Sequence, residues 1–190
     1  MVNENKVTIT AKDANELIVQ GKQLKNFHIT GDLDLFKIRG ELQTDLSIEN
    51  CIIDNLIAPA VKFSHHVHFN DVCFKRCSFN FARFYDGLLI ENCEFETYLD
   101  FSPGGHNEKN KLFSIRNSVF KEFVSFFDCW FQGDVEIVNN DFRKGTNLLG
   151  NKDDVYRVHF DFEPTIKNNL GLIDLDGEGD KSVNTIYYNL

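Results

Sequence analysis

The sequence predicts an all-β chain that winds into a parallel β-helix of about five to six coils, with a short helical cap at its N-terminus. Three features support this prediction. Large apolar residues recur at short and regular steps, every fourth member of the series falls at a nearly constant spacing, and asparagine or aspartate recurs in the same register.

The apolar residues follow one another at steps of five or six, apart from a single gap of fourteen. In most units a second apolar or small residue lies two positions earlier, so each unit resembles a short strand with two side chains on one face. A step of five would turn successive residues by roughly 140° on a helix, which forms no apolar stripe. Between Ile48 and Phe63 the series continues through Ile53 and Ala58. The predicted core consists of Ile48, Phe63, Phe69, Phe74, Phe79, Phe84, Ile90, Phe95, Phe101, Ile115, Phe120, Phe126, Phe131, Ile137 and Phe142.

Four units make one coil. Every fourth core position lies 21, 21, 25 and 22 residues from the one before, at Ile48, Phe69, Ile90, Ile115 and Ile137. This regularity indicates that each coil stacks on the previous one, with backbone hydrogen bonds between coils and the large side chains inside.

A polar column supports the same register. It consists of Asn50, Asp71, Asn92, Asn117 and Asn139. Because Asn and Asp tolerate bent backbone conformations, we expect them at one corner of the coil, stacked as a polar ladder.

Two segments, VCFKRCSFNFARF (72–84) and LLIENCEF (88–95), resemble the units of the pentapeptide-repeat proteins, with Phe at the centre and Cys, Ala or Val two residues before it. The resemblance covers roughly residues 27–148 and implies a right-handed, four-sided β-helix. Many steps are six residues long, and Val or Leu often fills the inner small position. A less regular right-handed parallel β-helix is therefore the alternative.

The chain divides into three parts. Residues 1–26 form the predicted cap, in which VTIT is a strand and Asp13-x-x-Glu16 begins a short helix that ends before Gly21. Residues 27–148 form the repeat, with a Gly- and Pro-containing loop at 102–111. Residues 149–190 are expected to be a non-repeat segment that caps the solenoid or contacts another chain.

Composition narrows the classes of function. The net charge is −9, and the whole imbalance lies after residue 85, where there are ten basic and nineteen acidic residues. An acidic surface disfavours direct nucleic-acid binding and suits a basic partner. No long apolar run and no secretory signal are present, so we expect a cytoplasmic protein that does not enter the membrane. The five cysteines are expected to be reduced.

The segment HHVHFNDVCFKRC (65–77) has the residue types of a metal site, but the repeat places Cys73 outside the coil and Cys77 inside it. The two thiols then cannot share a metal ion, so we expect neither metal nor cofactor. A surface site made by His66, His68 and Cys73 is the alternative.

We found no convergent set of nucleophile, base and acid, and therefore expect a protein that is not an enzyme. The resemblance implies a binding protein of the DNA-mimic type, whose acidic half docks on a basic groove of a protein such as a type II topoisomerase. The alternatives are a self-associating scaffold, including a homodimer, and a β-helix enzyme that acts on carbohydrates. The candidate interaction residues are Glu91, Glu94, Glu96, Asp100, Glu136, Asp141 and Trp130.

Overall fold

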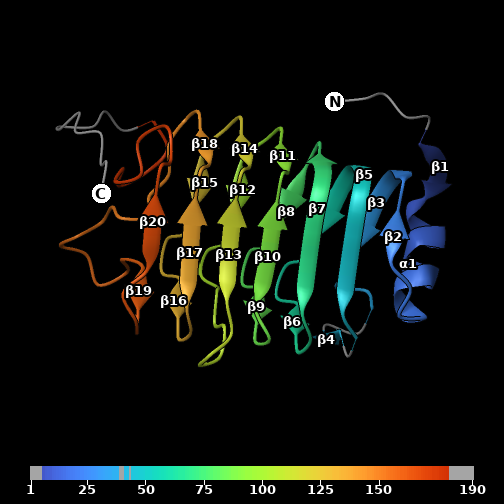
Figure 1. Ribbon diagram of the computed structural model, residues 1–190, viewed down its shortest axis with the longest axis horizontal. Coiled ribbons are helices and arrows are strands. Elements are labelled where there is room, and N and C mark those ends of the chain that lie inside the picture. Colours follow the sequence, from blue (N-terminus) through green and yellow to red (C-terminus); the bar gives the residue numbers. More distant parts are fainter. Residues whose placement is uncertain (1–5, 39–40, 43, 180–190) are drawn as a thin grey trace.

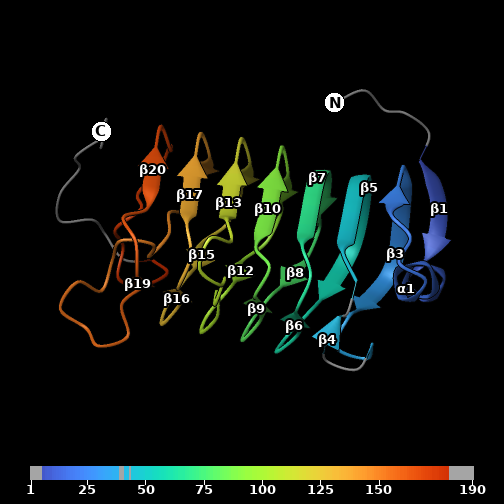
Figure 2. The same cartoon turned by 60° about the horizontal axis from the view of Figure 1, so that its bottom comes forward.

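A computed structural model describes residues 6–38, 41–42 and 44–179. The chain forms a parallel β-solenoid of about six coils, and the described residues contain one short helix at the N-terminal end. Figure 1 shows the coils stacked side by side along the long axis of the molecule, and Figure 2 shows the faces behind the front strands.

Strands of successive coils pair in parallel on four faces, which confirms the predicted fold class. The first face runs from β2 to β20 and shows the predicted register, since Ile48 pairs with Phe69, Phe69 with Ile90, Ile90 with Ile115, and Ile115 with Ile137. Its strands are β2 (Leu24–Lys25), the start of β5 (Leu46–Ile57), the start of β7 (Val67–Phe74), β10 (Leu88–Glu91), β13 (Phe113–Arg116), β17 (Val135–Val138) and β20 (Thr165–Lys167).

The second and third faces continue along the same long strands. The second face consists of β1 (Val7–Thr10), the start of β3 (Phe27–Asp34), the middle of β5, the end of β7, β11 (Glu94–Phe95), β14 (Val119–Phe120) and β18 (Asp141–Phe142). The third consists of the ends of β3 and β5, β8 (Cys77–Ser78), β12 (Leu99–Asp100) and β15 (Val124–Ser125).

The fourth face consists of β4 (Glu41–Leu42), β6 (Lys62–Phe63), β9 (Arg83–Phe84), β16 (Trp130–Phe131) and β19 (His159–Phe160). Between β9 and β16, Gly105 forms a bridge to Arg83 and another to Trp130. The first half of the predicted loop therefore belongs to a coil, and the exposed part is limited to residues 108–112.

All the predicted core residues are buried, and their rings stack from coil to coil. On the second face, ring centroids are 4.7 Å apart for Phe74 and Phe95, and 4.9 Å apart for Phe95 and Phe120. These distances match the spacing of about 4.8 Å between paired strands. Each inward Phe therefore packs on the Phe of the next coil at the distance that backbone pairing sets.

The polar column lies at the corner between the first and second faces, as predicted. Each of its members has a positive φ, from 48° at Asn50 to 57° at Asn139. Asn50 donates a side-chain hydrogen bond to Asn26 at 2.7 Å, and Asn139 donates one to Asn117 at 3.3 Å. Asn and Asp suit this corner because their short polar side chains reduce the cost of the left-handed conformation.

The N-terminal cap contains β1 and helix α1 (Ala11–Val19), whose Ala11, Ala14 and Ile18 are buried against the first coil. The helix begins earlier than predicted, because Thr10 is the N-cap residue. Its hydroxyl accepts from the Asp13 amide at 3.2 Å, and the Asp13 carboxylate accepts from the Thr10 amide at 3.3 Å. Asp13 is thus the third helical residue in a capping box rather than the cap itself.

The coils continue beyond residue 148, where the sequence suggested that the repeat ends. Trp130 pairs with His159, Ile137 pairs with Ile166, and Asn168 has a φ of 55°, like the corner asparagines. Residues 150–157 interrupt this last coil and break the spacing of five or six, which hides the repeat in the sequence. The part of the segment from residue 180 onward lies outside the described residues.

Phe113 compensates for a missing core side chain. The coil that contains Gly104 and Gly105 has no inward Phe on its fourth face. At the position of Phe113 the coils on either side of it place Leu46, Val67, Leu88 and Val135. The Phe113 ring fills this space, with centroids 4.7 Å from Phe131, 5.7 Å from Phe101 and 5.8 Å from Phe84.

We therefore predict that Phe113→Val destabilises the protein by about 2–4 kcal/mol, because it opens a cavity that no neighbouring side chain fills. The matched control Leu88→Val occupies the equivalent position and should cost only about 1 kcal/mol. Urea denaturation measures both. Equal costs for the two variants would show that Phe113 has no compensating role.

Candidate functional site

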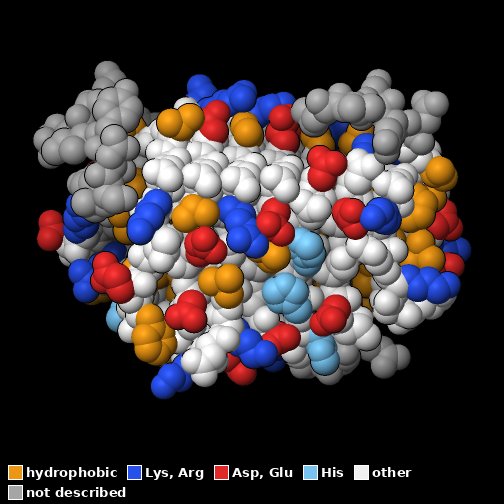
Figure 3. Space-filling model, in the orientation of Figure 1, with side chains coloured by type: hydrophobic (Ala, Val, Ile, Leu, Met, Phe, Trp, Pro, Cys, Tyr) orange, Lys and Arg blue, Asp and Glu red, His pale blue; other side chains and the backbone are white. Residues whose placement is uncertain are grey.

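The predicted interaction residues point outward from several faces, and three of the six carboxylates, those of Glu91, Glu94 and Glu96, are paired with cations of another coil. Arg116 Nε lies 2.8 Å from the Glu91 carboxylate, and His68 Nε2 lies 3.2 Å from its other oxygen. Figure 3 shows acidic and basic side chains side by side over the first face rather than one acidic patch.

Lys121 forms ion pairs with two more of the predicted carboxylates. Its Nζ lies 2.6 Å from Glu94 and 3.4 Å from Glu96, and the hydrogen bond to Glu94 is the main cause that raises the pKa of Lys121. Asp141 lies 3.2 Å from Arg143 on its own coil. Much of the negative charge expected on these faces is therefore locally neutralised.

Asp100 and Glu136 differ from the other predicted acids, since neither makes an ion pair within the described residues. Asp100 accepts hydrogen bonds from the Ser102 amide at 2.9 Å and from the Asn80 side chain at 2.9 Å. Glu136 is 3.4 Å from the Ser114 hydroxyl.

The cysteines lie where the repeat predicts. Cys51, Cys77, Cys93 and Cys129 are buried, and burial raises the pKa of the Cys93 thiol to about 12. Their thiols fill inner positions, and the Cys93 Sγ donates to the Glu91 carbonyl at 3.1 Å.

Cys73 is the half-buried thiol, and the structure does not bring it together with His66 and His68 as a ligand set. Within the described residues, its neighbours with metal-binding atoms are Glu94 and Glu96, all within 4.8 Å. Lys121 already contacts both of these carboxylates.

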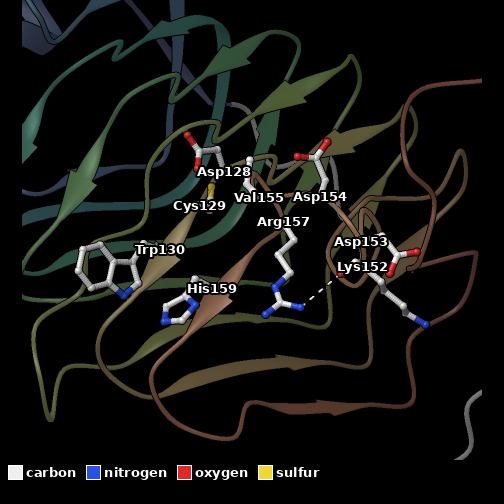
Figure 4. Close-up of a pocket in the computed structure, with 9 residues that line it drawn as sticks. All are labelled: Asp128, Cys129, Trp130, Lys152, Asp153, Asp154, Val155, Arg157 and His159. Atoms are coloured by element: carbon white, nitrogen blue, oxygen red, sulfur yellow. Dashed lines mark hydrogen bonds between the residues drawn. The ribbon is translucent and has the colours of Figure 1, made fainter.

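Trp130 lines a pocket of about 640 Å³ on the fourth face, toward the C-terminal end (Figure 4). The indole is 42% exposed, and its Nε1 donates to Asp161 at 2.8 Å. His159 pairs with Trp130 in the ladder, with ring centroids 6.0 Å apart, and its Nε2 lies 3.3 Å from the same Asp161 oxygen. The other lining residues are Asp128, Cys129, Lys152, Asp153, Asp154, Val155 and Arg157.

Sequence reasoning selected Trp130 but missed the other residues of this pocket. Residues 150–157 were assigned to a non-repeat tail, so their proximity to β16 was not expected. A signal does exist in the sequence, because Val158-x-Phe160 has the same spacing as Cys129-x-Phe131.

Comparisons of the chain with models of protein families, with curated proteins and with solved structures gave no match. The helical part of the described chain includes no segment long and apolar enough to cross a membrane.

The cross-coil ion pairs predict a specific pH dependence through Asp54. Lys75 Nζ is 2.7 Å and His28 Nε2 is 3.0 Å from its carboxylate, and these contacts lower the pKa of Asp54 from 3.8 to about 2, with Lys75 as the larger cause. Because the folded-state pKa is the lower one, ionised Asp54 stabilises the fold above about pH 4, and this contribution is lost as the pH falls toward 2.

We expect Asp54→Asn to lower the stability at pH 7 and to flatten its decline between pH 4 and pH 2. Chemical denaturation at a series of pH values measures this. The control Glu163→Gln, at an exposed acid without an ion pair in the described chain, should leave the profile unchanged. A wild-type profile in Asp54→Asn would contradict the assignment.

Proposed function

We propose that this chain is a non-enzymatic solenoid that binds another protein. The observation that carries the proposal is the conformation of Phe81, which has a φ of 59° and a side chain that is 54% exposed. A left-handed conformation costs a residue with a side chain about 1–2 kcal/mol. Exposing a large apolar ring at a strained corner gives the fold no benefit, and such strain tends to cluster at functional sites.

Phe81 belongs to an apolar ridge at the corner between the third and fourth faces. Backbone hydrogen bonds from Ala60 to Asn80, from Phe81 to Ser102 and from Asp128 to Tyr156 place Ala60, Phe81, Pro103, Asp128 and Arg157 in one column at this corner, and Phe127 and Tyr156 in the column next to it. We define the ridge as Ala60, Phe81 and Pro103 of the first column with Phe127 and Tyr156 of the second. The Phe127 and Tyr156 rings lie 5.5 Å apart, and both remain partly exposed.

Rigid aromatic side chains are common at the centres of protein interfaces, because they bury large areas at a small entropic cost. The ridge presents several of them from a backbone that the coil pairing fixes. The proposal of a non-enzymatic role is supported by the outward positions of the described coils, where acids face cations rather than a nucleophile with its base.

Phe81→Gly separates binding from folding. Glycine adopts the left-handed conformation freely, so we expect this variant to match or exceed the wild-type stability, by up to about 1 kcal/mol, while losing its partner. Urea denaturation measures stability, and capture of partners from a lysate of the host measures binding.

The matched control is Phe162→Ser, which removes an exposed aromatic ring between β19 and β20, at the corner of the fourth and first faces. Proteins retained by the wild type and by the control, but not by Phe81→Gly, would support the ridge. Identical partners for all three proteins would contradict the ridge as the binding surface.

The finer proposal concerns the partner, and it follows from the resemblance to pentapeptide-repeat proteins. In this version the rod mimics DNA and docks on the basic groove of a type II topoisomerase. The net charge of −9 supports it, as do Asp100 and Glu136, which make no ion pair among the described residues. A supercoiling assay with added protein tests it. The absence of both inhibition and protection of the enzyme against quinolone poisoning would contradict it.

A self-associating scaffold is the second candidate. Within the described residues, β20 pairs with β17 on one side and with no strand on the other, and Leu170 beside it is 62% exposed. Such an edge can pair with another chain. Light scattering over a range of concentrations tests this candidate, and a strict monomer would exclude it.

A cytoplasmic location is part of the main proposal. All the cysteines are free, which is typical of a reducing compartment.

A further inference from the structure

The pocket beside Trp130 combines an aromatic surface with cations. Arg157 and His159 lie on either side of Val158 in the sequence, and Val158 is buried in the core. His159 pairs with Trp130 and points outward beside it, and Arg157 is exposed in the bend that precedes β19. Figure 4 shows the imidazole of His159 between the indole of Trp130 and the guanidinium of Arg157.

The charge balance here differs from that of the first two faces. There, Lys25, Lys75, Arg116 and Lys121 each contact a carboxylate of another coil. In the described chain, the pocket cations Arg157 and Lys152 make no ion pair, and Arg157 donates only to the Lys152 carbonyl, at 3.3 Å.

The aspartates of the pocket do not neutralise this group. Asp154 accepts a hydrogen bond from the Tyr156 amide at 2.9 Å and so stabilises the turn that leads to Arg157. In Figure 4 the carboxylates of Asp128 and Asp154 point away from the tips of Trp130, His159 and Arg157, while Asp153 lies at the rim with Lys152. The carboxylates of Asp128 and Asp154 therefore lie apart from the aromatic and cationic side, where Asp161 is held by Trp130 and His159.

The indole is held in place for a ligand. Asp161 accepts from its Nε1, and the rings of His106 and His159 contact it at centroid distances of 5.9 and 6.0 Å. Burial, and secondarily Arg83, lower the pKa of His106, which keeps this ring neutral at pH 7. Trp130 thus offers a fixed aromatic surface that remains 42% exposed.

We propose that this pocket binds a small molecule in which a planar ring carries a phosphate, the chemistry of a nucleoside monophosphate. The ring stacks on Trp130, and the phosphate pairs with Arg157, whose donors suit an anion. The volume of about 640 Å³ lies within the range of small-molecule sites. A nucleic-acid strand is disfavoured because the net charge of −9 repels a polyanion. This inference is independent of the protein-binding ridge.

The test uses the only tryptophan of the chain, which lies in the pocket wall. Indole fluorescence is followed, with excitation where adenine does not absorb, during titration with adenosine monophosphate, with adenosine and with inorganic phosphate. We expect saturable quenching by the monophosphate, at an affinity at least about tenfold above that of either fragment, because two contacts act together. Equal affinities for the monophosphate and for phosphate would overturn the role of Trp130, and no saturable change would overturn the site.

Two variants show where the ligand binds. Arg157→Gln should weaken monophosphate binding by about tenfold or more, since it removes a charged donor. Lys62→Gln, which removes a cation from the same face outside the pocket, should not change the affinity. Urea denaturation confirms that both variants are folded. Equal effects of the two substitutions would show that the positive charges of the whole fourth face attract the monophosphate, and would contradict a defined site.

Discussion

The structure depends on the match between two distances. Paired parallel strands lie about 4.8 Å apart, and the ring centroids of offset-stacked aromatic side chains lie about 4.5 Å apart or more. A Phe that points inward at the same place in each coil therefore packs on its neighbour without straining the backbone, as the Phe74, Phe95 and Phe120 rings do. Where one coil lacks its Phe, Phe113 supplies the missing volume from the adjacent face. This constraint explains why the core tolerates steps of both five and six residues, since the register is reset at each corner.

The same register decides what the surface offers. Outward side chains of successive coils also lie one strand spacing apart, which is close enough for Glu91 to meet Arg116 and for Glu94 to meet Lys121. A net negative charge thus does not become a uniformly acidic face. At the corners, left-handed residues are a structural requirement that Asn and Asp meet at low cost, and Phe81 meets it at a higher one. The features left unexplained by the fold are the apolar ridge and the unpaired cations beside Trp130, and both proposals rest on them.

The fold could be predicted because the repeat is written directly in residue spacing. Periodicity indicated the inward residues, the outward residues and one corner, and the residue pairs on the first and second faces follow it. The last coil could not be predicted, because residues 150–157 separate Leu148 from Phe160 and interrupt the period. The predicted start of the helix was wrong, because the side chains of Thr10 and Asp13 each accept a hydrogen bond from the other's backbone amide. The spacing of Asp13 and Glu16 suggested a start at Asp13 instead. The ion pairs of the candidate acids depend on the direction in which each side chain reaches toward the next coil, and residue spacing does not determine that direction. The Trp130 pocket depends on residues 150–157, which leave the coil and return beside β16, and residue spacing does not predict this return either.

The stacking register is tested most directly by distances between spin labels on the first face. Ser47, Glu136 and Thr165 occupy the same outward column, with Glu136 four coils and Thr165 five coils from Ser47. The native Cys73 is replaced by serine, and labelled cysteines are placed at Ser47 with Glu136 and at Ser47 with Thr165. Pulsed electron spin resonance should give backbone separations of about 19 Å and about 24 Å, an increase of one strand spacing. Distances that are equal, or that differ by much more than one spacing, would contradict the in-register solenoid.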